Sequence, residues 1–214
     1  MANTQQWQDS YWPLLMQAYM QKPAGMKTAG SRPIIDLAVL LHLRPKALCE
    51  RMEALERHES PSLQRVWDTY HNNTRRLNRD AKTLRAMMGF GTAGLFYDGV
   101  ESADSFERFY SPIEPESDVT PAVLTVVLGL YLSLTVNTMV ADTPEVADMA
   151  RATRLTTDQV LDILAIYQTF DPILKRTPLD HSPIVDEARR VWDKYYNAPA
   201  ALEEKVAQLD EYFK

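Results

Sequence analysis

Basic side chains at helical spacing are the residues of this sequence best suited to bind a charged partner. Arg75, Arg79 and Lys82 follow one another at steps of four and three, which places them on one face of a helix, and Arg85 lies one turn further along. Such a stripe holds phosphate or carboxylate groups through charge and hydrogen bonding. The spacing therefore predicts a contact surface for nucleic acid or for an acidic partner.

Sequence patterns of catalysis and cofactor binding are weak by comparison. The segment from Gly89 to Gly94 matches the dinucleotide pattern G-x-G-x-x-G, but that fingerprint must follow a strand and open a helix. Here it follows a helical pattern, which favours a helix stop and a joint. The four histidines lack the spacing of metal ligands, and the single cysteine, Cys49, has no obvious base nearby. We expect no catalytic residue, no cofactor and no metal site.

Length and composition indicate a soluble globular protein. The chain has 214 residues, enough to bury a core as one domain or as two small ones. Its 45% apolar and 24% charged content is typical of that class. The first residues lack the basic and apolar regions of a secretory signal, and a single cysteine excludes an intrachain disulfide. These features favour a cytoplasmic protein.

Charge is distributed unevenly along the chain. Residues 1–100 hold 13 basic and 9 acidic residues, a net charge of +4, whereas residues 101–214 hold 10 and 20, a net charge of −10. Such a split either marks the basic half as the surface for nucleic acid or another acidic partner, or reflects two solvated faces that attract each other. Both interpretations stay open.

Apolar residues recur at helical spacing along most of the chain, which predicts an all-α fold of about ten helices. Ser or Thr just before Pro marks several expected helix starts, since Ser and Thr cap helices and Pro suits the first turn. Ser60, Thr120 and Ser182 are three of them. The pattern from 61 to 88 is expected to be interrupted at 71–74, where Asn and Thr disfavour a helix interior.

Residues 122–140 carry no charge and are long enough to span a membrane. However, Thr, Ser and Asn dilute the run, its flanks are acidic, and no Lys/Arg cluster sets an orientation. We therefore expect no membrane span but a helix over 121–140, buried on all sides at the centre of the fold. A pair of strands is the alternative, because the run is rich in Val and Thr.

One short string occurs twice in the sequence. Residues 65–70 read R-V-W-D-T-Y and residues 190–195 read R-V-W-D-K-Y. A shift of 125 carries Trp67 onto Trp192 and keeps the inner positions of the following helix apolar, whereas a shift of 112 aligns the upstream helices. Outer charges reverse under the same shift, as from Arg79 to Glu204. The interpretation is one scaffold that presents two different surfaces, with both tryptophans in its core.

The repeat predicts an internal duplication of a five-helix module. Residues 1–88 form the first copy, with a basic outer face, and residues 118–214 form the second, with an acidic one. Residues 89–117 are a joint, rich in glycine and then acidic. The two copies are expected to form one compact unit.

Residues 34–52 resemble a helix-turn-helix, with Ala38 as the small residue of the first helix and Leu43 at the turn. The second copy resembles it as well. His42 and Arg154 stand where the motif usually has glycine, which departs from the pattern.

If the first copy binds DNA as this resemblance implies, its second helix enters the major groove N-terminus first. The contacts would then be Arg44, Lys46 and Arg51. Asp158 and Asp162 in the second copy argue against the same use there, because phosphate would repel them.

The sequence as a whole is similar to bacterial all-helical proteins with a YWPLL opening, a GFGTAGLFYDG-type joint and a TPEVADMA helix, a similarity that implies no activity. We therefore expect a non-catalytic interaction or adaptor protein with a protein partner. The alternative is a helix-turn-helix-type nucleic-acid-binding regulator that uses the basic first copy.

Overall fold

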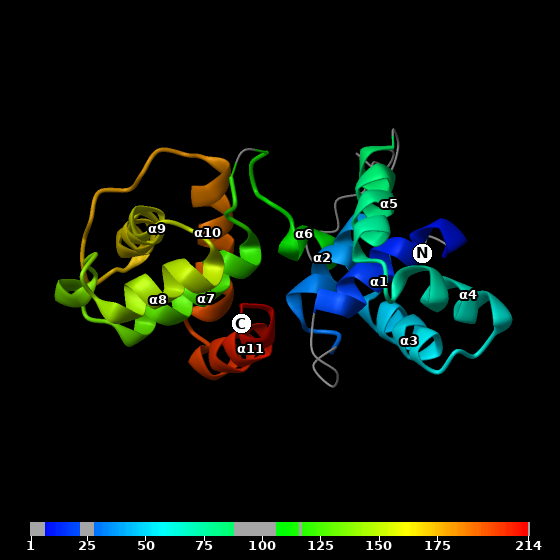
Figure 1. Ribbon diagram of the computed structural model, residues 1–214. Helices are drawn as coiled ribbons and strands as arrows, with labels where there is room; N and C mark the ends of the chain where they lie inside the picture. Colours follow the sequence, from blue (N-terminus) through cyan, green and yellow to red (C-terminus); the bar gives the residue numbers. More distant parts are fainter. Residues whose placement is uncertain (1–6, 22–27, 88–105, 116, 214) are drawn as a thin grey trace. The chain divides into compact units, whose positions relative to one another are not determined.

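The part of the chain that the computed structural model describes is helical in all its regular structure (Figure 1). It contains eleven α-helices and two short 3-10 helices, and none of its residues lies in a β-strand. The all-α prediction is therefore confirmed. The described residues are 7–21, 28–87, 106–115 and 117–213.

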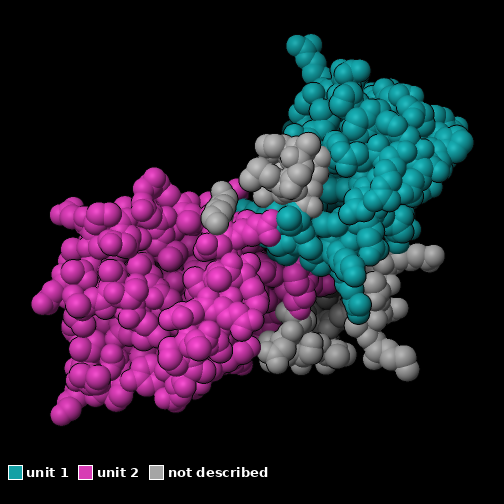
Figure 2. Space-filling model, turned by 90° about the horizontal axis from the view of Figure 1, so that it is seen from below, with its two compact units in different colours: residues 1–103 teal, residues 104–214 magenta. Residues whose placement is uncertain are grey.

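The chain divides into two compact units, residues 1–103 and 104–214, which Figure 2 colours separately. Each unit has a hydrophobic core of its own. The predicted boundaries at 88 and 118, and the single body expected of the two copies, stay predictions.

The first unit packs four helices around α1. Helix α1 follows a short 3-10 turn, η1, and contacts each of the four helices that come after it. Its buried side chains include Leu14, Leu15 and Met16, none of which is exposed to solvent. The elements are η1 (Asp9–Tyr11), α1 (Trp12–Gln21), α2 (Arg32–Leu41), α3 (Pro45–Glu56), α4 (Pro61–Tyr70) and α5 (Thr74–Ala86).

The second unit packs its helices around α7 in the same manner. Helix α7 contacts the short helix that precedes it and each of the four α-helices that follow. The elements are α6 (Phe106–Tyr110), α7 (Pro121–Ser133), η3 (Val136–Thr138), α8 (Pro144–Thr153), α9 (Thr157–Phe170), α10 (Pro183–Tyr195) and α11 (Pro199–Phe213).

Helix starts follow the Ser/Thr-Pro pattern of the sequence. The hydroxyl groups of Ser60, Thr120 and Ser182 each accept a hydrogen bond from the backbone N–H three residues later, at 3.2–3.3 Å. These bonds satisfy donors that a helix N-terminus leaves unpaired. The expected interruption at 71–74 is also present, since α4 ends at Tyr70 and the Asn73 side chain caps α5.

Helix α7 is buried on all sides over residues 121–128, as expected, but its last two residues are exposed and it is shorter than predicted. The helix ends at Ser133 instead of continuing to 140. Beyond that point Thr135 and Thr138 bond to each other's backbone and form a 3-10 turn. Such local bonds compete with the helix ladder. No helix of the described residues is long and apolar enough to cross a membrane.

The helices of the two units follow the same order and pack in the same pairs. Helices α1 to α5 correspond to α7 to α11, and each of the seven pairings among the first five recurs among the second five. Trp67 stacks on His71 with ring centroids 4.5 Å apart, and Trp192 stacks on Tyr196 at 4.3 Å. These features support the duplication, which stays a prediction.

The two tryptophans differ in burial, although Trp192 lies in the core of its unit and Trp67 packs against the core of the first. Trp192 is only 4% exposed. Trp67 is half-buried, and α4, on which it lies, has no fully buried side chain. The second unit also contains α6, a short helix within the acidic stretch that was predicted to be a joint.

Candidate functional site

Helix α5 carries the stripe of basic residues that the sequence predicts. Its five basic side chains are all exposed, and they share the helix with one acidic side chain, Asp80. The corresponding helix α11 has one basic residue, Lys205, and four acidic ones. We call the five basic residues the basic face of α5: Arg75, Arg76, Arg79, Lys82 and Arg85.

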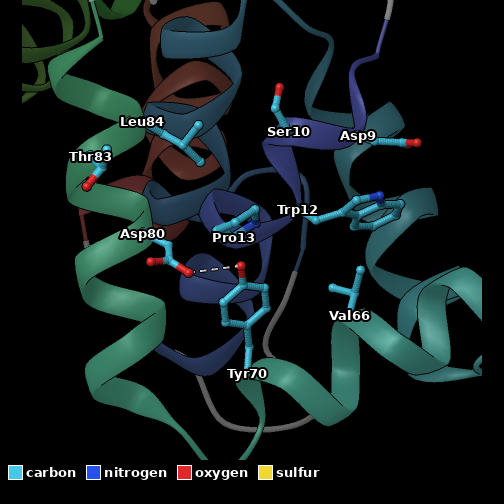
Figure 3. A pocket seen from close by; sticks show the side chains of 9 residues that line it. All are labelled: Asp9, Ser10, Trp12, Pro13, Val66, Tyr70, Asp80, Thr83 and Leu84. Atoms are coloured by element: carbon cyan, nitrogen blue, oxygen red, sulfur yellow. Dashed lines mark hydrogen bonds between the residues drawn. The ribbon is translucent and has the colours of Figure 1, made fainter.

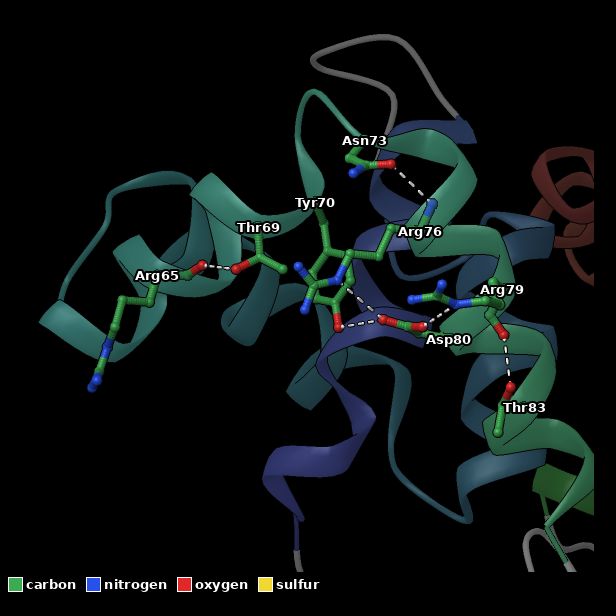
Figure 4. A network of polar contacts seen from close by, with 8 residues as sticks. All are labelled: Arg65, Thr69, Tyr70, Asn73, Arg76, Arg79, Asp80 and Thr83. Atoms are coloured by element: carbon green, nitrogen blue, oxygen red, sulfur yellow. Dashed lines mark hydrogen bonds and ion pairs between the residues drawn. The ribbon is translucent and has the colours of Figure 1, made fainter.

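Asp80 organises part of this face (Figure 4). Its carboxylate accepts hydrogen bonds from the Tyr70 hydroxyl at 3.2 Å and from Arg79 Nε at 3.1 Å, and Arg76 Nε lies 3.6 Å away. The Arg76 guanidinium also lies over the Tyr70 ring, 5.9 Å from its centroid. Two of the five cations are therefore held by an internal carboxylate, and Arg75 and Lys82 extend the charge to either side.

The pKa values of the pair Tyr70 and Asp80 move apart. Burial and the bond to Asp80 raise the pKa of the Tyr70 hydroxyl. For Asp80, a desolvation effect that raises the pKa is outweighed by the hydrogen bonds from Arg79 and Tyr70, so its pKa is lowered. Tyr70 thus stays a donor and Asp80 an acceptor at neutral pH.

We expect Asp80 to titrate below its ordinary value of 3.8 in the folded protein. Its stabilising contribution is present above the unfolded-state pKa and is lost as the pH falls through the folded-state pKa. Carboxyl-carbon NMR titration measures this pKa directly. Tyr70→Phe should raise it, and Glu107→Gln, a change of a carboxyl group in the second unit, should leave it unchanged.

Arg85 extends the basic face toward α1. Its Nη1 donates to Gln17 Oε1 at 2.7 Å, and Gln17 Nε2 donates to Asn78 Oδ1 at 2.9 Å. A single α1 side chain therefore bridges two positions of α5 and fixes its rotation. This rotation turns Leu77 and Ala81 into the core and the basic residues outward.

Helices α2 and α3 form the tight turn that the helix-turn-helix resemblance requires. His42 adopts a left-handed conformation with φ 53°, and Arg154 does the same with φ 63° in the second unit. Both occupy the position where the motif usually has glycine, because glycine adopts this conformation without strain. The Leu43 amide bonds back to the Ala38 carbonyl at 3.0 Å and closes the turn.

The predicted DNA contacts on α3 do not form one surface. Arg44 and Lys46 are exposed at its N-terminus, but Arg51 is half-buried with its guanidinium 4.4 Å from the ring centroid of Trp7. The outward face after Lys46 presents Glu50 and Glu53. Two carboxylates at the centre of a recognition helix would repel phosphate. The predicted residues thus fall into two groups, the end of α3 and the basic face of α5.

A groove that sequence reasoning missed lies beside α4 in the first unit (Figure 3). It consists of two adjoining hollows of about 400 and 460 Å³, and Asp9, Trp12 and Val66 line both. Tyr70 and Leu84 line the first hollow, with Asp80 and Thr83 of α5 beside them. Arg51, Ser62 and Arg65 line the second. We call the whole the N-terminal groove.

The histidines and the glycine pattern singled out in the sequence have the following places. The described residues contain no cluster of three or more His, Cys, Asp or Glu residues that would hold a metal ion. His58 and His71 both pack on the ring of Trp67. The glycine pattern at Gly89 to Gly94 lies outside the described residues. Comparison with protein-family models, curated proteins and solved structures finds no match to this chain.

Proposed function

We propose that this chain is a non-catalytic interaction protein whose first unit binds an acidic protein partner through the basic face of α5. The observation that carries the proposal is the charge of that helix, five basic side chains and one acidic one, all of the basic ones exposed. Exposed guanidinium and ammonium groups along one helix recognise carboxylates by charge and hydrogen bonding. The duplicated scaffold then presents this basic surface on one copy and an acidic surface on the other.

An acidic protein suits the surface better than nucleic acid does. Phosphate backbones need several uncompensated cations on a contact surface. Asp80 lies at both Arg76 and Arg79 and offsets part of their charge. Glu50 and Glu53 on α3 would also repel a duplex placed there. The helix-turn-helix-type regulator remains the second candidate, supported by the tight α2–α3 turn and by the cations at the start of α3.

We expect the triple variant R75Q/R79Q/K82Q to lower affinity for a labelled polyglutamate peptide about tenfold, since exposed ion pairs contribute a fraction of a kcal/mol each. Fluorescence anisotropy at two salt concentrations measures this, and the variant should also show a flatter salt dependence. The matched control R44Q/K46Q removes cations from α3 and should bind the peptide as the unchanged protein does.

A labelled random-sequence duplex distinguishes the second candidate. Tighter binding of the duplex than of polyglutamate, lost in R44Q/K46Q, would support the regulator and contradict our proposal. Equal affinity of the triple variant and the unchanged protein for polyglutamate would exclude the basic face of α5 as the binding surface.

A further inference from the structure

The N-terminal groove of the first unit has a counterpart in the second unit, and there a short helix, α6, covers it. Helix α6 lies against α7, α10 and α11. Its Phe109 and Tyr110 pack on a small core formed by Ala122, Val126 and Leu209. The Tyr110 ring lies 4.8 Å from the ring of another α11 residue, Tyr212. Two neighbouring aromatic residues thus anchor a five-residue helix.

Two contacts of charged side chains also hold α6 in place. Arg108 Nη2 lies 3.1 Å from Glu187 Oε2 on α10, and Glu187 is only 14% exposed. Lys205 Nζ of α11 lies 4.7 Å from the centroid of the Phe109 ring. The second unit therefore recognises α6 by aromatic burial, one ion pair and one cation–π contact.

Two of the three residues that α6 covers correspond to residues that line the groove. The shift of 112 carries Ser10 onto Ala122, and the shift of 125 carries Leu84 onto Leu209. Ala122 and Leu209 are 0% and 1% exposed. Ser10 is exposed and Leu84 is half-buried. The same position of the fold is thus closed in one unit and accessible in the other.

The acidic residue that pairs with α6 is absent from the first unit, whereas the neighbouring arginine is kept, since Arg190, which also pairs with Glu187, corresponds to Arg65. Glu187, which pairs with α6, corresponds to Ser62, and the Arg65 guanidinium donates to the Ser62 hydroxyl at 3.2 Å. Arg51 lines the same hollow. A side chain at the place of Arg108 would therefore face two arginines and one carboxylate, Asp9, which lines the same hollow. This net positive surrounding favours an acidic side chain over an arginine.

We propose that the N-terminal groove binds a short helix of a partner protein that carries two adjacent aromatic residues preceded by an acidic one. The aromatic rings fill the hollow between Trp12, Val66 and Leu84, and the carboxylate faces Arg51 and Arg65. Helix-in-groove recognition of this kind is anchored by apolar residues on one face of the helix. The site is distinct from the basic face of α5 and stands whether or not that face binds a partner.

Two labelled peptides of residues 104–112, one unchanged and one with R108E, test the proposal by anisotropy with the full chain. We expect the R108E peptide to bind about tenfold more tightly, because its carboxylate meets arginines instead of adding a third cation. Arg65→Glu in the protein should reverse this preference. A preference for the unchanged peptide would contradict the proposed charge of the partner.

Leu84→Glu places a charge in the apolar part of the groove and should lower affinity for the R108E peptide at least about tenfold. Ala86→Glu makes the same change at an exposed α5 position outside the groove and should have no effect. Ser10→Trp, a substitution at an exposed position, fills the hollow and should block binding even if the Leu84 variant folds poorly.

Binding that survives both Leu84→Glu and Ser10→Trp would overturn the proposal, as would the absence of binding by either peptide to the folded chain. If the peptides bind only by displacing a second copy of the chain from a dimer, the occupant of the groove is that second copy. This result would also overturn the proposal. Polyglutamate binding to Ser10→Trp, which changes no charge, should be unchanged, and this separates failure here from failure of the basic face of α5.

Discussion

Replacing Trp192 by alanine is expected to lower the free energy of unfolding of the second unit by about 3–5 kcal/mol. The indole is 4% exposed and lies among three other aromatic residues besides Tyr196, namely Tyr131, Tyr167 and Phe170. Removal of the ring leaves a cavity at the meeting point of α7, α9 and α10, and aromatic pair contacts are lost as well. Urea unfolding followed by far-UV circular dichroism measures the loss.

Trp67→Ala is the matched control, because it makes the same change at the corresponding position of the first unit. Trp67 is half-buried and contacts Tyr19, His58 and His71. Less apolar surface returns to water when it is removed, so we expect a loss of about half that size or less. Equal losses for the two variants would contradict the difference in burial between the units.

Gly129→Gln is expected to destabilise the second unit by about 1–3 kcal/mol or more, as overpacking of a core does. A Cβ atom at Gly129 would lie 3.0 Å from Cγ2 of Val206 on α11, and a longer side chain adds to this clash. The first unit has Gln17 and Ala81 at the corresponding positions. There the larger residue is on α1 and the smaller on α5, the reverse of the arrangement in the second unit.

Val206→Ala should therefore restore part of the stability that Gly129→Gln removes. The double variant reproduces the residue pair of the first unit, and a double-mutant cycle on urea unfolding isolates the coupling between the two positions. Val206→Ala alone leaves a small cavity and is expected to be mildly destabilising. Additive losses in the double variant would show that these two side chains do not determine the spacing of α7 and α11.

Local sequence rules predicted most of the helical architecture. Capping residues such as Ser60 and Ser182 and the interruption before Thr74 depend on neighbours in the chain, and they are where the sequence placed them. The end of α7 was missed, because the uncharged run continues past Ser133 while side-chain hydroxyls take over the backbone bonds. Apolar content alone does not show that competition.

The candidate site likewise has a part that the sequence predicted and a part that it did not. The basic face of α5 follows from helical periodicity, although the sequence did not show that Asp80 would hold Arg76 and Arg79. The N-terminal groove was not predictable, because a groove is defined by residues that fail to cover it. Helix α6 is only five residues long and lies in an acidic stretch, so its aromatic residues were the one available signal.

The short connection between α6 and α7 makes it difficult for a free ligand to displace α6 from its site in the second unit. Only residues 111–120 separate the two helices, and a short tether of this kind holds a segment at an effective concentration on the order of millimolar. A diffusing peptide of similar affinity must exceed that concentration to displace α6. Among the described residues of the first unit, no helix is tethered in this way over the N-terminal groove. Tethering of α6 alone therefore directs a partner with aromatic anchors to the N-terminal groove, and away from the corresponding site that α6 occupies in the second unit. This preference adds to any difference in the contacts that the two sites make.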